Sequence, residues 1–181
     1  MPAPNVGRHH IFSVLVENRF GVLTRVAGLF ARRGFNIYSL AVSPTEDDRF
    51  SRMTIVVDAE SAPLEQISKQ LHKLIPVIKI AEIAPGDGVE RELMLVTVKA
   101  TPEFRSQVTE LAAIFDARVV DVGYDAVTIE LAGTPDQLDA MSDLLAPFGI
   151  LERQRTGRIA MARLTRQAPN TKLRAVKGRA V

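Results

Sequence analysis

The sequence predicts an α+β protein built from two consecutive ferredoxin-like domains, each with the element order βαββαβ. Two observations support this class. The hydrophobic periodicity gives strand, helix, strand, strand, helix, strand over residues 11–83, and the same order recurs over residues 93–162. Between the repeats lies Pro85-Gly86-Asp87-Gly88, a sequence typical of turns. We therefore expect a first domain at residues 9–84, a linker at 85–92 and a second domain at 93–164.

The first repeat begins with IFSVLV at residues 11–16, a short apolar run rich in branched residues that is typical of a buried strand. Apolar residues then recur at helical spacing from Val22 to Phe30. This helix is expected to end at Gly34, because glycine readily adopts the left-handed conformation found there. The other expected elements are strands 36–42 and 52–57, a helix within 64–75 and a strand at 77–83.

The second repeat follows the same plan with a shorter hairpin. Its expected elements are strand 93–98, helix 104–115, strands 118–123 and 126–132, helix 138–148 and closing strand 150–162. A repeat of this size buries only about 60% of its surface when folded alone, and helices cover one face of such a sheet. We therefore expect each half to pack against a further partner. A second copy of the chain is favoured, and the other half of the same chain is the alternative.

The composition excludes several classes of protein. Because the chain has no cysteine, it cannot carry a disulfide framework, a thiolate nucleophile or a cysteine-based metal site. No apolar run approaches the roughly 18 to 20 residues that span a bilayer. Residues 1–8 also lack the apolar segment of a signal peptide. These features predict a cytoplasmic protein without membrane contact.

The net charge of +2 comes from the tail, residues 165–181, which holds five of the 23 basic residues and no acidic one. Without those five, 18 basic residues stand against 21 acidic ones, so the folded part is not predicted to bind a polyanion. The tail mixes proline, asparagine and glycine with scattered cations, and we expect it to be disordered. Weak contact of this tail with a polyanion is the alternative to a solubilising role.

Catalytic apparatus is not visible in the sequence. The histidines are the pair His9 and His10 and the isolated His72, without the spacing of a zinc-binding helix. The cluster Glu46-Asp47-Asp48 falls in a hairpin turn, where exposed carboxylates are expected to keep ordinary pKa values. The third strand also lacks the aromatic residues that RNA recognition on this scaffold needs. The sequence therefore predicts a binding protein rather than an enzyme, with no nucleic acid partner.

The stretch between the first strand and the first helix is the most informative one. A helix N-terminus favours an anion such as a carboxylate, and Gly21, which has no Cβ, lets a ligand approach the backbone. The amides of Asn18 and Asn36 can donate and accept hydrogen bonds. With apolar walls nearby, this mixture suits a branched α-amino acid. The candidate residues are Asn18, Gly21, Val22, Leu23, Asn36 and Ile37.

A structural role is the alternative for the same residues. Asn18 could cap the helix, Gly21 could serve the turn, and Asn36 could start the next strand. The residues alone favour this structural interpretation.

Longer stretches resemble the regulatory (small) subunit of acetolactate synthase, also called acetohydroxyacid synthase. In the first half these are VENRFGVLTRVAGLFARRGFNIYSLAVSPTE, SRMTIVV and LEQISKQLHKL. In the second half they are ERELMLVTV, IFDARVVDV, TIELAGTPDQLDA and RTGRIAMAR. The resemblance covers nearly the whole chain, from about His10 to Arg163.

This resemblance implies an N-terminal ACT domain, a C-terminal ferredoxin-like domain and no active site or cofactor in this chain. It implies a catalytic large subunit as partner, which uses thiamine diphosphate, Mg²⁺ and FAD in branched-chain amino acid synthesis. The small subunit would activate that partner and confer feedback inhibition, by valine or another branched-chain amino acid. The effector would lie between the ACT domains of a homodimer, with Asn18, Gly21, Val22 and Leu23 from one chain facing Asn36 and Ile37 of the other.

Two positions depart from the family pattern. This chain has Tyr38 where an acidic residue usually follows the Asn-Ile pair, and Phe20 where a small residue or proline usually precedes the glycine. Phe20 could narrow the mouth of the pocket. A free-standing amino-acid sensor acting on another partner is the alternative function, and an enzyme in its own right is a further one.

Overall fold

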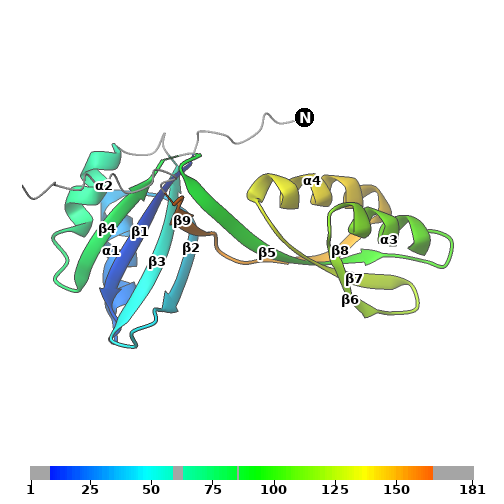
Figure 1. Ribbon diagram of the computed structural model, residues 1–181, viewed down its shortest axis with the longest axis horizontal. Helices are drawn as coiled ribbons and strands as arrows, with labels where there is room; N and C mark the ends of the chain where they lie inside the picture. Colours follow the sequence, from blue (N-terminus) through cyan, green and yellow to red (C-terminus); the bar gives the residue numbers. More distant parts are fainter. Residues whose placement is uncertain (1–8, 59–62, 85, 165–181) are drawn as a thin grey trace, which may run out of the picture.

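The computed structural model describes residues 9–58, 63–84 and 86–164, so the tail lies outside the described residues. Figure 1 shows two units, each a sheet with two helices on one face. The elements of the first unit are β1 (His9–Glu17), α1 (Val22–Arg33), β2 (Ile37–Pro44), β3 (Phe50–Asp58), α2 (Leu64–Leu71) and β4 (Val77–Ile83). Those of the second are β5 (Gly88–Lys99), α3 (Arg105–Ile114), β6 (Arg118–Val122), β7 (Ala126–Gly133), α4 (Pro135–Leu145), the 3₁₀ helix η1 (Ala146–Phe148), β8 (Ile150–Arg155) and β9 (Ile159–Ala162).

The two sheets have equivalent strand orders. The first runs β2-β3-β1-β4 and the second runs β6-β7-β5-β8, with all neighbouring strands antiparallel. In both units the first strand therefore lies beside the third and the fourth, which is the ferredoxin-like arrangement. The predicted fold class is confirmed.

Each unit has its own core between its sheet and its helices. In the first unit the alternate β1 residues Phe12, Val14 and Val16 point toward α1 and α2 and are fully buried. The second unit repeats this with Met94, Val96 and Val98 of β5, which point toward α3 and α4. Burial of these side chains provides the main free energy that fixes each layer, at about 25 cal/mol per Å² of apolar surface.

The helix ends follow local sequence. Gly34 ends α1 in the left-handed region (φ 69°) and donates its N–H to the carbonyl of Ala31, as its sequence position predicts. The second helix ends at Leu71, within the predicted range 64–75. The chain then continues in tighter turns, with the N–H groups of Lys73 and Leu74 bonded three residues back, before Pro76. Ile75 is 82% exposed.

The closing strand of the second unit differs from the prediction. Residues 150–162 form two strands, β8 and β9, separated by Thr156, Gly157 and Arg158. β8 pairs with the second part of β5, whereas β9 pairs with its first residues, Gly88–Arg91. Part of the expected linker 85–92 therefore lies in a two-stranded ribbon. Figure 1 shows β5 running from the first unit into the second, with the return segment beside it.

This ribbon covers part of the helix-free face of the first sheet. Ala160 of β9 is buried there against Ile11, Val56 and Ile83. Of the two partners expected for this face, the other half of the same chain therefore supplies the cover at this end of the sheet.

Candidate functional site

The loop between β1 and α1 brings a glycine to the start of a helix. Gly21 is the N-cap of α1, with φ 80° and ψ 0°, a conformation that glycine adopts at little cost. A Cβ built on Gly21 meets no atom within 4 Å. The backbone is thus open at this point to a ligand of several atoms.

The first turn of α1 has free donors and no competing acid. Val22 donates its N–H to the carbonyl of Arg19 at 3.4 Å, but within the described residues the N–H groups of Leu23 and Thr24 have no acceptor. No acidic residue lies in this turn, and no side chain caps it. No acidic side chain in this turn therefore neutralises the positive end of the helix dipole, which is left available to an anionic ligand.

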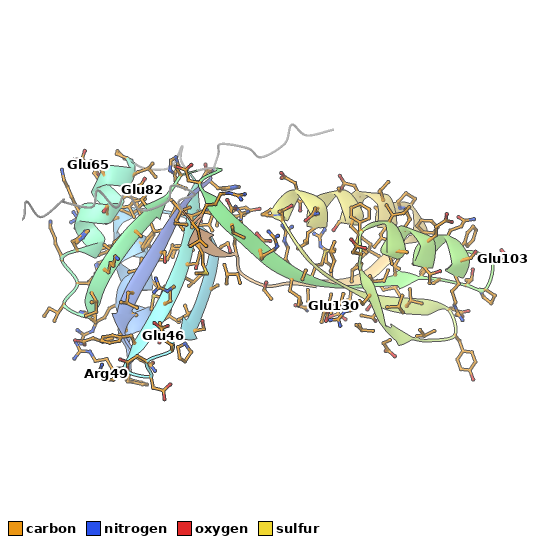
Figure 2. The ribbon with its side chains drawn as sticks, viewed as in Figure 1. Glu46, Arg49, Glu65, Glu82, Glu103 and Glu130 are labelled. Atoms are coloured by element: carbon orange, nitrogen blue, oxygen red, sulfur yellow. The ribbon has the colours of Figure 1, made fainter. Side chains whose placement is uncertain are left out.

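Asn18 does not cap the helix, so that part of the structural interpretation is wrong. Its Nδ2 donates to the carbonyl of Asp48 at 2.9 Å, and its backbone N–H donates to the carbonyl of Arg49 at 2.7 Å. Both acceptors lie in the turn of the β2–β3 hairpin, whose tip carries Glu46 and Arg49 in Figure 2. These bonds hold the amide in place, while within the described residues its Oδ1 accepts no hydrogen bond and can serve a ligand.

The hairpin turn that holds Asn18 is fixed by an ion pair. The carboxylate of Asp47 accepts from Arg49 Nε at 2.9 Å and from its Nη2 at 2.6 Å. The hydrogen bonds from the Arg49 side chain and backbone lower the pKa of Asp47 to about 2. The expectation that all carboxylates of this turn keep ordinary pKa values was therefore wrong for Asp47, because the charged form is the one that Arg49 stabilises.

This shift predicts how the turn responds to acid. Since the pKa is lowered in the folded chain, the ion pair contributes fully above the ordinary value of 3.8 and is lost as pH falls through about 2. The NMR signal of the Asp47 carboxyl carbon should therefore titrate with a midpoint near 2. A midpoint close to 3.8 would contradict the ion pair in solution.

The apolar candidates divide into core and surface. Val22 is buried in the core of the first unit, and Ile37 packs against that core. Both residues therefore hold the backbone of the candidate site in place through core packing. Leu23 is 45% exposed and is free to contact a ligand. Two residues treated only as departures from the family pattern, Phe20 and Tyr38, are 106% and 50% exposed. The sequence does carry a signal for this exposed apolar surface, because it places the large side chain of Phe20 directly before Gly21.

The six candidate residues do not form one site within a single chain. β1 and β2 both run antiparallel to β3, so they point the same way. Asn18 follows the end of β1, whereas Asn36 precedes the start of β2, at the opposite end of the sheet. The 12-residue helix α1 between them is about 18 Å long. None of the six lines either of the two described cavities, although Tyr38, next to Ile37, lines the smaller one.

The histidines have packing roles. His9 stacks on Tyr38 with ring centroids 4.0 Å apart, and a ring nitrogen of His72 lies 2.9 Å from the carbonyl of Ser68. His10 Nδ1 lies 3.7 Å from a Glu82 carboxylate oxygen. Within residues 9–58, 63–84 and 86–164, no three histidine or acidic side chains gather as a metal site would require. In the same part of the chain, no helix is long and apolar enough to cross a membrane.

Comparison with known proteins assigns the family. Residues 12–79 match the family described as "AHAS small subunit-like ACT domain", and residues 91–164 match "Small subunit of acetolactate synthase". The probable acetolactate synthase small subunit of Archaeoglobus fulgidus is 54% identical over 154 residues, covering 85% of this chain and 96% of that one. The chain belongs to the acetolactate synthase small-subunit family.

Two further relatives of this chain support the same family assignment. The acetolactate synthase small subunit of Mycolicibacterium smegmatis is 52% identical, over 85% of this chain and 91% of its own. The crystal structure of the small subunit from Thermotoga maritima superposes with a TM-score of 0.81 at 39% identity, covering 87% of this chain and 99% of that one. These relatives are the regulatory rather than the catalytic component of acetolactate synthase, which confirms the prediction of a non-catalytic chain.

Proposed function

We propose that this small subunit activates the catalytic subunit of acetolactate synthase and makes it sensitive to a branched-chain amino acid, with valine preferred. The observation that carries the proposal is the divided site. A helix start with unpaired N–H donors and the anchored amide of Asn18 lie at one end of the first sheet, and Asn36 and Ile37 lie at the other. Two chains are needed to complete such a site.

The free edge of β2 supports a specific dimer. Within the described residues β2 pairs as a strand only with β3, so apart from the Leu40 peptide, against which Gly157 packs, its outer edge is open to another strand. Antiparallel pairing of two β2 strands about a twofold axis would extend the sheet to eight strands. Because the strands then run in opposite directions, the start of one β2 meets the end of the other, at the same end of the sheet as Gly21. Asn36 of one protomer would thus approach the Gly21 loop of its partner.

The chemistry of this shared site fits a branched α-amino acid. The carboxylate would accept from the free N–H groups of Leu23 and Thr24 at the start of α1. The ammonium would donate to Asn18 Oδ1 and to the side-chain oxygen of Asn36 from the partner. The aliphatic side chain would lie against Leu23 and Phe20, which are exposed in one chain. Each site would bury apolar surface from both protomers.

Regulation would then follow from a difference in affinity. A ligand shifts an equilibrium only if it binds one arrangement of the two ACT domains better, and typical couplings are about 1–3 kcal/mol. We propose that valine stabilises an arrangement that supports the catalytic subunit less well. Thiamine diphosphate, Mg²⁺ and FAD would be bound by that catalytic subunit in a cytoplasmic complex, while this chain supplies the effector site alone.

One reconstitution tests the proposal. The purified chain is mixed with a catalytic subunit from the same family of synthases, and acetolactate formation is followed while valine, leucine and isoleucine are titrated separately. We expect the chain to raise the activity and valine to lower it again. Valine binding without any effect on the synthase would favour the free-standing sensor, and acetolactate formation by the chain alone would contradict a purely regulatory role.

Asn36 provides a matching prediction. Replacing Asn36 by Ala removes one hydrogen bond to a charged group, worth about 1.5–3 kcal/mol, so the valine concentration for half inhibition should rise about tenfold or more. Asn36 is exposed and belongs to neither core of the described residues, so the activity without valine should stay the same. Normal valine sensitivity in Asn36→Ala would remove this residue from the site.

A further inference from the structure

The segment of residues 156–162, here called the strap, connects the second unit back to the first sheet. Its last residues form β9, and Ala160 is buried against that sheet. Its first residues contact β2, the strand that begins at Ile37, directly after Asn36. The strap therefore touches the proposed effector strand and also belongs to the second unit.

The contact between the strap and β2 is close and specific. A Cβ on Gly157 would lie 2.1 Å from the carbonyl oxygen of Leu40 and 3.0 Å from the nitrogen of Ala41, so only glycine fits against this peptide. The next residue, Arg158, donates its backbone N–H to Ser39 Oγ at 2.7 Å. Any shift of β2 near Ser39 must therefore move the strap or break this contact.

A buried ion-pair network continues from the strap into the second unit. Arg158 is 7% exposed and donates from Nε to Glu92 at 2.8 Å and from Nη1 to Glu90 at 3.0 Å. The second oxygen of Glu92, itself buried, accepts from Arg155, and Arg155 also pairs with Asp139 of α4. Burial disfavours the charge of Arg155, but the hydrogen bonds that it donates to Asp139 and Glu92 outweigh this effect and raise its pKa. Side chains thus join β2 to α4 without a gap.

The start of β2 is irregularly paired and borders a cavity, while Ile37 packs against the first core and Tyr38 stacks on His9. The pairing of β2 with β3 is irregular between Ile37 and Ser39, so the strand is not held in regular register next to the proposed site. A cavity of about 310 Å³ separates part of β2 from the second unit, with Tyr38, Glu92 and Thr156 among its lining residues. Ser39 is the point where this irregular segment is attached to the strap.

We propose that the strap transmits effector occupancy from β2 to the second unit, with Gly157, Arg158 and Ser39 as the positioning residues. This inference rests on the proposed function, since it assumes that an amino acid binds at Asn36 and Ile37. Binding there fixes the position of the start of β2. Because Ser39 and the Leu40 peptide contact the strap, the strap takes up a matching position. The Arg158–Glu92–Arg155 network then couples the position of the strap to that of α4. The second unit is then the part of the chain that responds to the effector.

The test separates binding from response. Gly157→Ala places a methyl group against the Leu40 carbonyl and displaces the strap, whereas both cores stay unchanged. Gly123→Ala is the matched control, because its Cβ makes an ordinary 3.4 Å contact with a carbonyl oxygen in the β6–β7 turn. Valine binding is measured by calorimetry on the full chain, and inhibition and activation are measured with the reconstituted synthase.

We expect Gly157→Ala to bind valine within about twofold of the natural chain and to activate the synthase, while inhibition at saturating valine falls at least fivefold, the lower end of the roughly 5- to 150-fold range of typical couplings. Gly123→Ala should behave like the natural chain. Unchanged inhibition in Gly157→Ala would overturn the proposal, as would a parallel loss of binding and inhibition. Failure of the natural chain itself to bind or respond to valine would instead overturn the proposed function.

Ser39 gives a milder second pair of variants in case Gly157→Ala does not fold. Ser39→Ala removes the acceptor of the Arg158 N–H, and Ser39→Thr keeps a hydroxyl at the same position. Inhibition should weaken in Ser39→Ala without loss of valine binding and should return in Ser39→Thr. Equal inhibition in the two variants would show that this contact does not transmit the signal.

Discussion

Gly21→Asp should abolish inhibition by valine while leaving activation of the synthase intact. The new carboxylate would stand where the carboxylate of the ligand is proposed to bind, at the open start of α1. Two like charges about 4 Å apart repel by about 4 kcal/mol at an effective dielectric constant near 20, which corresponds to roughly a thousandfold in affinity. The inhibition curve of the reconstituted synthase measures the effect, and the half-inhibitory valine concentration should rise at least about a hundredfold.

Two variants control for size and backbone. Gly21→Asn adds a side chain of the same size without the charge, and asparagine tolerates a positive φ, so its effect should be clearly smaller. Gly86→Asp places the same carboxylate on another glycine with positive φ (88°) and open space around it, but between the two units. Inhibition should be normal in that variant. An unchanged inhibition curve for Gly21→Asp would place the effector site elsewhere.

Glu92→Ala should destabilise the second unit by about 3–5 kcal/mol, because it leaves the buried guanidinium of Arg158 and the partly buried one of Arg155 without their shared carboxylate. Glu92 is 6% exposed and pairs with both Arg155 and Arg158. Urea denaturation of the full chain measures the loss. Hydrogen exchange of the backbone amides of residues 93–99, the part of β5 inside the second sheet, assigns the loss to the second unit rather than the first.

Glu130 supplies the matched control for this prediction. It pairs with Arg118, which is 76% exposed, on the helix-free face of the second sheet (Figure 2). Surface pairs of this kind contribute about 0–1 kcal/mol, so Glu130→Ala should have little effect. If Glu92→Ala and Glu130→Ala lower the free energy of unfolding by the same amount, burial does not set the strength of the Glu92 ion pairs.

Local sequence was sufficient to predict the elements and their order. The strand IFSVLV, the helical stripe from Val22 to Phe30 and the glycine at position 34 each specify one structure through nearby residues alone. Doubling of the pattern then predicted two equivalent units. The break at Gly157 was missed, because its cause is the distant Leu40 carbonyl and the sequence around it reads as one extended strand.

The candidate site was predictable as a set of residues and not as a geometry. Residue chemistry supplied Asn18 and Asn36, and the family resemblance favoured their binding role, but only the strand directions show that they lie at opposite ends of one sheet. The anchoring of Asn18 by the carbonyls of Asp48 and Arg49 depends on a hairpin 30 residues away. Both acceptors are backbone carbonyls, which every residue type carries, so the sequence could not reveal these hydrogen bonds.

The shared site is tested most directly by mixing two defective chains. Gly21→Asp and Asn36→Ala, carrying different affinity tags, are co-expressed, and the dimer that contains one chain of each is purified through both tags. In a twofold dimer one of the two sites then carries both substitutions and the other carries neither. Calorimetry should find valine binding restored with natural affinity at about half the natural stoichiometry, although each variant alone binds at least about tenfold more weakly. If the mixed dimer binds no better than either variant alone, the effector site is not shared between two chains.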